Sequence, residues 1–347
     1  MNGLNLTILA LIWFSVYCVP IAMAQGGEEV FGCEANPTGN PIGGGEGYSD
    51  IKTTGDFIVK TKEELLQALK DAKPGQVIFI PDGVEIDLAG QQGIGLPAGV
   101  TLAGTRGLNG SAGARIFTTW RQSHTLMKTT GDSVRLTGLR FEGPEGGTEK
   151  TADYFAFLSI GHYGAEVDNC EVSRFNLSGI SIGSASIDVR VHHNYIHHCQ
   201  RSGYGYGVVV GEGGVHVIAN KFDYCRHHIA AGGQPGCNYE AAWNLVMPNC
   251  TSYCFDVHGG GDRGDNTDIG GDWILIHHNT FQGPQRAVGL YGVPSQRGEI
   301  HHNWFAQELE KAVLALGNTR VYDNACGPDR TPQGKPMEFV DRKLVEL

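Results

Sequence analysis

The segment "VHHNYI" (residues 191–196) decides the fold, because its pattern returns along the second half of the chain. Each copy has an apolar residue, two variable positions, an asparagine, one more variable position and, in most copies, an apolar residue. The other copies are "VIANKF" (217–222), "AAWNLV" (241–246), "IHHNTF" (276–281), "IHHNWF" (300–305) and "VYDNAC" (321–326). Regular recurrence of one short unit is typical of a solenoid, in which each repeat packs on the next.

The asparagines of these copies are separated by 26, 24, 35, 24 and 21 residues. Stacked amide side chains can hydrogen-bond from one rung to the next. With short alternating strands and glycine turns, a period near 24 predicts an all-β, right-handed parallel β-helix. The 35-residue interval predicts a loop inserted on one face. The asparagines are Asn194, Asn220, Asn244, Asn279, Asn303 and Asn324, and Leu139 and Cys170 take the same position in earlier segments.

Many histidines belong to the same frame, immediately before the asparagine. Because the repeat explains them, we interpret them as scaffold and not as a histidine-rich metal site. They are His192, His193, His277, His278, His301 and His302.

Composition narrows the class of protein further. The chain has 347 residues with 51 glycines and few helix-forming runs, which favours a turn-rich β protein. The chain has a formal charge of −11, whereas a nucleic-acid-binding protein usually carries an excess of basic residues. We therefore expect no nucleic-acid partner. We expect a monomer that requires a local basic patch to bind any anionic substrate.

Residues 1–24 are apolar, uncharged and end in Ala22-Met23-Ala24, which predicts a cleaved signal peptide, with a retained anchor as the alternative. We therefore expect a secreted, periplasmic or cell-surface protein with no membrane contact after cleavage. The predicted organisation is an N-terminal segment (25–50), a single β-helix domain (51–330) and a C-terminal tail (331–347).

An exported chain permits disulfides, and eight cysteines remain after residue 24. Cys199 and Cys225 each lie five residues beyond their asparagine, so they should be neighbours in adjacent rungs. A disulfide and a plain stack of thiols both remain open there. Cys250 and Cys254 are separated by three residues, which alone is a weak zinc signal.

The segment "TKEELLQALKDAKPG" (61–75) predicts a capping helix at the N-terminal end of the solenoid. Thr61 and Glu64 form a capping box, and Pro74-Gly75 ends the helix. This helix, "AKPGQVIFIPDG" (72–83), "LPAGVTLAGTRG" (96–107) and the asparagine rungs together resemble the pectate-lyase-like β-helix superfamily over about residues 57–328. The resemblance implies the fold. The superfamily contains polysaccharide lyases, glycoside hydrolases, uronate epimerases and binding proteins.

A second column of strands lies between the asparagine turns, and "CFDVH" (254–258) is its most unusual member. Alternation places Phe255 and Val257 inside and Asp256 and His258 on the outer face. Their neighbours in adjacent rungs are small, which predicts a groove. Tyr291 is expected one rung beyond and His228 one rung before. The neighbouring strands are "GISIG" (179–183), "GVVVG" (207–211), "HIAAG" (228–232), "AVGLY" (287–291) and "AVLAL" (312–316).

The stretch "YCFDVHGGGD" (253–262) resembles the Asp-Pro-His-Asp motif of alginate C5-epimerases and related lyases. Asp256 and His258 match the first Asp and the His, whereas Val257 replaces Pro and Gly259 replaces the second Asp. The resemblance implies abstraction of the C5 proton of a uronic acid.

For that chemistry we expect His258 to be the base, held in one tautomer by Asp256. Tyr291 would be the acid, or the base in a tyrosine-based variant. Arg286 and Lys311, which begin the next two rungs, would neutralise the substrate carboxylate, with Arg226 and Arg263 as alternatives. The predicted function is a polysaccharide lyase cleaving an acidic, uronate-containing glycan. The alternatives are a uronate C5-epimerase, a glycoside hydrolase, and a non-catalytic glycan-binding β-helix.

The inserted loop "GGGDRGDNTDIGGD" (259–272) follows His258 and predicts a wall of the groove. Its Asp262, Asp265 and Asp268 offer the hard oxygen ligands of a Ca²⁺ site, although their spacing differs from an EF-hand. A transition-metal site formed by His228, Asp256 and His258 is the competing metal hypothesis.

Overall fold

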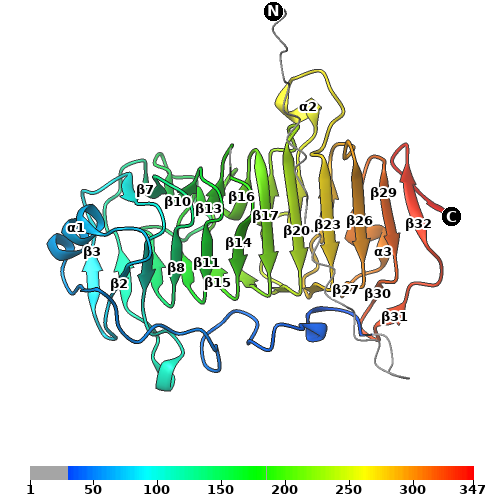
Figure 1. Ribbon diagram of the computed structural model, residues 1–347. Coiled ribbons are helices and arrows are strands. Elements are labelled where there is room, and N and C mark those ends of the chain that lie inside the picture. Colours follow the sequence, from blue (N-terminus) through cyan, green and yellow to red (C-terminus); the bar gives the residue numbers. More distant parts are fainter. Residues whose placement is uncertain (1–29, 185) are drawn as a thin grey trace, which may run out of the picture.

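The structure is a computed structural model that describes residues 30–184 and 186–347, and within these its strands form sheets of 13, 9 and 11 strands. The sheets run side by side along one elongated right-handed parallel β-helix, as the asparagine period predicts (Figure 1). The predicted signal peptide lies outside the described residues. None of the described helices is long and apolar enough to cross a membrane.

The 13-stranded sheet is parallel from its first strand to β29 and ends in two antiparallel strands. Its strands, in spatial order, are β1 (Phe57–Ile58), β2 (Val77–Phe79), β5 (Thr101–Ala103), β8 (Arg135–Thr137), β11 (Glu166–Asp168), β14 (Val189–His192), β17 (Gly213–Ile218), β20 (Cys237–Ala242), β23 (Trp273–His277), β26 (Arg297–His301), β29 (Thr319–Tyr322), β32 (Met337–Val340) and β33 (Lys343–Glu346).

The nine-stranded sheet contains the strand of Asp256 and is parallel throughout. Its strands are β4 (Ile94–Leu96), β7 (His124–Thr129), β10 (Phe155–Ile160), β13 (Ser178–Ile182), β16 (Tyr206–Val210), β19 (His227–Ala231), β22 (Phe255–Val257), β25 (Val288–Leu290) and β28 (Val313–Leu314). Its predicted inward positions are buried to 2% exposure or less, which confirms the alternation.

The 11-stranded sheet closes each rung after the asparagine turn. Its strands are β3 (Glu85–Asp87), β6 (Arg115–Phe117), β9 (Arg140–Glu142), β12 (Glu171–Ser173), β15 (Tyr195–His197), β18 (Lys221–Asp223), β21 (Leu245–Val246), β24 (Thr280–Phe281), β27 (Trp304–Phe305), β30 (Ala325–Cys326) and β31 (Thr331–Pro332).

The asparagines form a continuous buried ladder between the 13-stranded and 11-stranded sheets. The backbone N–H of Asn220 donates to Asn244 Oδ1 at 2.9 Å, and that of Asn244 donates to Asn279 Oδ1 at 3.0 Å. Cys170 enters the ladder through its N–H, which donates to Asn194 Oδ1 at 2.9 Å. At the other end, Asn324 Nδ2 donates to Gln333 Oε1 at 3.0 Å. The ladder therefore runs from Cys170 to Asn324 within the frame read from the sequence.

The residue before each ladder asparagine adopts a left-handed conformation. His193, His278 and His302 have φ values of 53°, 52° and 53°. Non-glycine residues rarely adopt positive φ, and histidine is among those that tolerate it best. Neighbouring histidines then pair, as in the 2.8 Å contact between His277 Nδ1 and His278 Nδ1. The turn geometry therefore explains why these histidines occur here, and it gives them a structural role.

Residues 30–50 run back along the ladder side of the β-helix, seen as the blue segment along the lower edge of Figure 1. The N–H of Gly32 donates to His302 O at 2.9 Å, and that of Gly43 donates to Ala219 O at 2.8 Å. Tyr48 OH then donates to the buried carboxylate of Asp168 at 2.9 Å. This segment, which includes the short 3₁₀ helix η1 (Cys33–Ala35), therefore packs across many rungs.

Both ends of the solenoid are covered. At the N-terminal end lies α1 (Lys62–Asp71), whose N-cap Thr61 forms a capping box with Glu64. At the C-terminal end, residues placed in the tail by the sequence form β31, β32 and β33, which pair antiparallel with the last rungs. The remaining helices are η2 (Leu108–Gly110), α2 (Gly260–Arg263) and α3 (Leu309–Ala312).

Candidate functional site

Asp256 and His258 meet on the outer face of the nine-stranded sheet, as alternation predicts. His258 Nε2 lies 3.1 Å from Asp256 Oδ2. Asp256 is in register with Ala230 on β19 and Gly289 on β25, so its neighbours above and below are small. The His258 side chain is 45% exposed, which leaves part of its ring open to a ligand.

Asp256 itself does not line an open groove, which corrects the sequence interpretation. The residue is only 3% exposed. Its carboxylate lies beneath His258 on one side and faces His227 Nε2 at 3.6 Å on the other. The small neighbours leave space that these two imidazoles occupy, so Asp256 can position a histidine but cannot reach a sugar directly.

His227 is a site residue that the sequence interpretation missed. Its Nδ1 lies 2.6 Å from the carbonyl oxygen of Tyr253, which can only accept, so Nδ1 carries a proton. Burial lowers the pKa of His227 to about 4, so the ring is neutral at neutral pH. Its Nε2 then has a free lone pair and no hydrogen-bond partner among the described residues.

His228 does not lie beside Asp256, contrary to the prediction. It is fully buried, and its ring packs 5.6 Å from that of Phe222 inside the β-helix. The N–H groups of His228 and Ile229 both donate to Cys254 O, at 2.8 and 3.2 Å. This bulge-like irregularity shifts the alternation by one residue, because two successive side chains then face inward. His227 takes the outward position, and a metal site of His228, Asp256 and His258 is excluded.

Tyr291 lies one rung beyond His258, as predicted. Its ring leans over Gly289, where an added Cβ would come within 3.0 Å of Tyr291 Cε2. The ring centroid is 5.7 Å from that of Tyr253, and the two hydroxyl-bearing side chains hydrogen-bond. Burial and Tyr253 both raise the pKa of Tyr291. Tyr291 is therefore a protonated phenol at neutral pH.

Two arginines flank this group from opposite rungs. The Arg286 guanidinium lies 5.5 Å from the Tyr253 ring, and its charge opposes the rise in the pKa of Tyr291. On the other side, Arg226 hydrogen-bonds Tyr206 and acts electrostatically on His258. Both are only partly buried, so a local positive region exists on a chain with net charge −11.

Arg263 has a different role, because it organises the inserted loop that projects at α2 in Figure 1. It donates to Gly232 O at 2.9 Å and to Ile269 O at 2.8 Å. Its Nε also pairs with Asp265 Oδ2 at 2.8 Å. The guanidinium is thus committed to the loop and is not available to a substrate.

The loop carboxylates are not gathered into a cation site. Asp265 uses one oxygen for Arg263 and the other for the N–H and hydroxyl of Thr267, at 3.0 and 2.7 Å. Within the described parts of the chain, the groups close enough to share a metal lie elsewhere and include neither Asp262 nor Asp268. The calcium site stays a prediction that this loop geometry does not favour.

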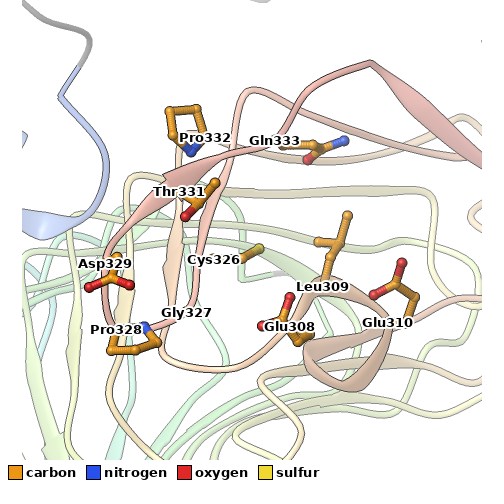
Figure 2. A pocket seen from close by; sticks show the side chains of 10 residues that line it. All are labelled: Glu308, Leu309, Glu310, Cys326, Gly327, Pro328, Asp329, Thr331, Pro332 and Gln333. Atoms are coloured by element: carbon orange, nitrogen blue, oxygen red, sulfur yellow. The ribbon is translucent and has the colours of Figure 1, made fainter.

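Two hollows lie near the C-terminal half. One of about 320 Å³ lies between α3 and β31 and is lined by Glu308, Glu310 and Asp329 without any basic side chain (Figure 2). This acidic lining would repel an anionic glycan. The other, of about 300 Å³, is lined by Tyr291 and Arg342 and therefore adjoins the candidate site.

Comparison with known proteins identifies no family. No protein-family model matches the chain, and no curated protein matches it significantly. One similar solved structure is that of an alginate lyase from Paenibacillus sp. str. FPU-7. It is 16% identical, with 70% of this chain and 80% of that chain covered and a TM-score of 0.46. At that identity and TM-score the likeness carries no conclusion about function.

Proposed function

We propose that the protein is an exported polysaccharide lyase that acts on an acidic, uronate-containing glycan at the outer face of the nine-stranded sheet. The observation that carries the proposal is the 3.1 Å contact between His258 and Asp256. It lies beside a phenol, Tyr291, and between two arginines. An acid, a base and positive charge are the groups that β-elimination from a uronate requires.

His258 fits the base. Asp256 accepts only, so in the neutral ring Nε2 donates to the carboxylate and Nδ1 keeps the lone pair. The half-exposed ring can present Nδ1 to the C5 proton of a bound uronate. Asp256 then stabilises the imidazolium that forms, because their hydrogen bond favours the charged ring.

Tyr291 fits the acid. As C5 loses its proton to His258, a C4–C5 double bond forms and the bond from C4 to the glycosidic oxygen breaks. The phenol then donates its proton to the leaving oxygen. Its raised pKa keeps that proton available at neutral pH. Atoms and charge balance when His258 later returns the C5 proton to solvent and Tyr291 is reprotonated.

Arg286 and Arg226 supply positive charge for the substrate carboxylate, whose neutralisation acidifies the C5 proton. A glycoside hydrolase fits less well, because it needs two carboxylates flanking the scissile bond. Asp256 is covered by two imidazoles and cannot act as one of them. An epimerase would use the same base and return a proton to the opposite face.

Assays on alginate, pectate, glycosaminoglycans and ulvan-like glycans test the proposal. A lyase produces an unsaturated uronate that absorbs in the near ultraviolet. An epimerase produces no such absorbance but exchanges the C5 proton with solvent deuterium. Activity in the first assay supports the lyase, and activity in the second alone identifies an epimerase. Binding to a glycan without either activity would identify a binding protein.

The pH profile should report His258. Its hydrogen bond to Asp256 raises its pKa above the ordinary value of about 6.5, and kcat/KM should fall as pH drops through that raised value. Asp256→Asn should therefore move the acid limb of kcat/KM to lower pH. The stability that the His258–Asp256 pair contributes to the fold depends on pH in the opposite direction to kcat/KM. It is present below about pH 6.5 and is lost as pH rises through the raised pKa. An acid limb that does not move in Asp256→Asn would exclude His258 as the base.

A further inference from the structure

A second cluster lies inside the β-helix, directly behind the outer-face site. It consists of His228, Cys250 and Cys254, whose ligand atoms all lie within 4.8 Å of one another. The three residues are 0%, 5% and 1% exposed. They come from β19, from the turn after β21 and from the residue just before β22, so different parts of two rungs converge there.

His228 is the unusual member. Its two ring nitrogens have no nitrogen or oxygen partner among the described residues, although the ring is fully buried, and the thiol of Cys250 is the one group that interacts with them. A buried polar group without a partner costs about 1–3 kcal/mol, and such orphans in native structures call for an explanation. The ring lies against Phe222, and the two thiols are the metal-ligating side chains that gather around it among the described residues.

Water is a poor occupant for this position. A buried water needs two to four polar partners, and sulfur is a weak donor and acceptor. Carboxylates, which would attract Ca²⁺ or Mg²⁺, are absent from this group. Two sulfurs and one imidazole are instead the ligand set preferred by soft or borderline ions.

We propose that His228, Cys250 and Cys254 bind a thiophilic ion, Zn²⁺ or Cu⁺, inside the β-helix. On binding, each thiol releases its proton to solvent and ligates as a thiolate, while neutral His228 ligates through one ring nitrogen. No electrons are transferred. Three protein ligands suit Cu⁺ directly, whereas Zn²⁺ would take a fourth ligand that is not from this cluster.

The ion would act as a clamp beneath the outer-face site. His228 is the neighbour of His227, and Cys254 is the neighbour of Tyr253, which accepts the hydrogen bond of His227. Ligation would tie the turn that contains Cys250 to β19 and fix these outward side chains. Ion binding itself does not require the proposed lyase activity, because the three ligands face the interior.

The competing arrangement is a disulfide between Cys250 and Cys254, whose sulfurs lie 2.9 Å apart. It would leave His228 without any partner. Peptide mapping of the full chain under non-reducing conditions distinguishes the two, since free thiols are alkylated and a disulfide is not. Recovery of a Cys250–Cys254 disulfide in the protein as purified would overturn the proposal.

Metal analysis of the reduced full-length protein, incubated with Zn²⁺ or with Cu⁺ and then desalted, tests the site directly. We expect about one ion per chain and a raised melting temperature with one of the two ions. Cys254→Ser should lose the bound ion, whereas Cys237→Ser should retain it. Cys237 is equally buried but lies outside the cluster, which makes it a matched control.

Cobalt substitution provides a test that does not depend on how the variants fold. Co²⁺ bound to the unsubstituted chain should show a thiolate-to-cobalt charge-transfer absorption that Zn²⁺ displaces. Failure of Zn²⁺, Cu⁺ and Co²⁺ to bind a chain with free thiols would overturn the proposal. Equal loss of the ion from Cys254→Ser and Cys237→Ser would overturn it as well.

Discussion

Replacing His258 by alanine should lower kcat/KM by about 10²–10⁴-fold, the usual contribution of a positioned acid or base. The loss follows from the half-exposed ring of His258, which is oriented by Asp256 and has the phenol of Tyr291 one rung away. The fold should survive, because the loss of the hydrogen bond to buried Asp256 costs about 1–3 kcal/mol and the core side chains of this strand stay in place. Initial rates of unsaturated-uronate formation and thermal melts measure the two effects.

His216→Ala is the matched control. The His216 side chain is 44% exposed and lies 2.6 Å from Glu240, so it repeats the exposure and the carboxylate partner of His258. It projects from β17, in the 13-stranded sheet, and lies outside the candidate site. Its replacement should leave the rate unchanged. Equal losses in both variants, or full activity in His258→Ala, would show that the His258–Asp256 pair belongs to the scaffold.

The centre of the candidate site could be predicted because Asp256 lies within β22, and His258, which follows the strand directly, continues its alternation. Phe255 and Val257 must face the core, and the outward positions follow. The error at His228 arose because alternation was extended beyond the strand's regular part. There, two N–H groups share one carbonyl, and no residue type in "CRHHIAA" marks that irregularity.

Other side chains of the site are positioned by contacts between rungs, and the sequence alone does not predict these contacts. Arg226, His227 and Tyr253 each precede or begin a strand, where the turn fixes the side-chain direction. The fold was easier to predict from the sequence than the site, because one asparagine per rung defines both the period of the repeat and the register of its strands. Residues 30–50 carry no such repeat, and their path along the ladder follows from particular hydrogen bonds such as that of Tyr48 with Asp168.

Asn244→Ala should lower the free energy of unfolding by more than about 4 kcal/mol. Losses of that size are exceptional for a single substitution and occur when a buried hydrogen-bond network is broken. The side chain is fully buried and makes four hydrogen bonds. It accepts from the backbone and side chain of Asn220, and it donates to Val217 O and Asn279 Oδ1, both at 2.8 Å. Alanine leaves these groups buried without partners, at about 1–3 kcal/mol each. Denaturant titration followed by circular dichroism measures the loss.

Asn238→Ala is the control, because it removes an asparagine that lies outside the ladder. Asn238 is half-buried, accepts from Trp273 N–H at 3.0 Å and donates to Gly236 O at 3.0 Å. Water can replace both bonds, so the expected cost is about 1 kcal/mol. In a solenoid each rung contacts only its neighbours, so Asn244→Ala should also broaden the transition as the two halves uncouple. Similar midpoints and slopes of the denaturation curves for the two variants would show that the ladder contributes little to the stability of the fold.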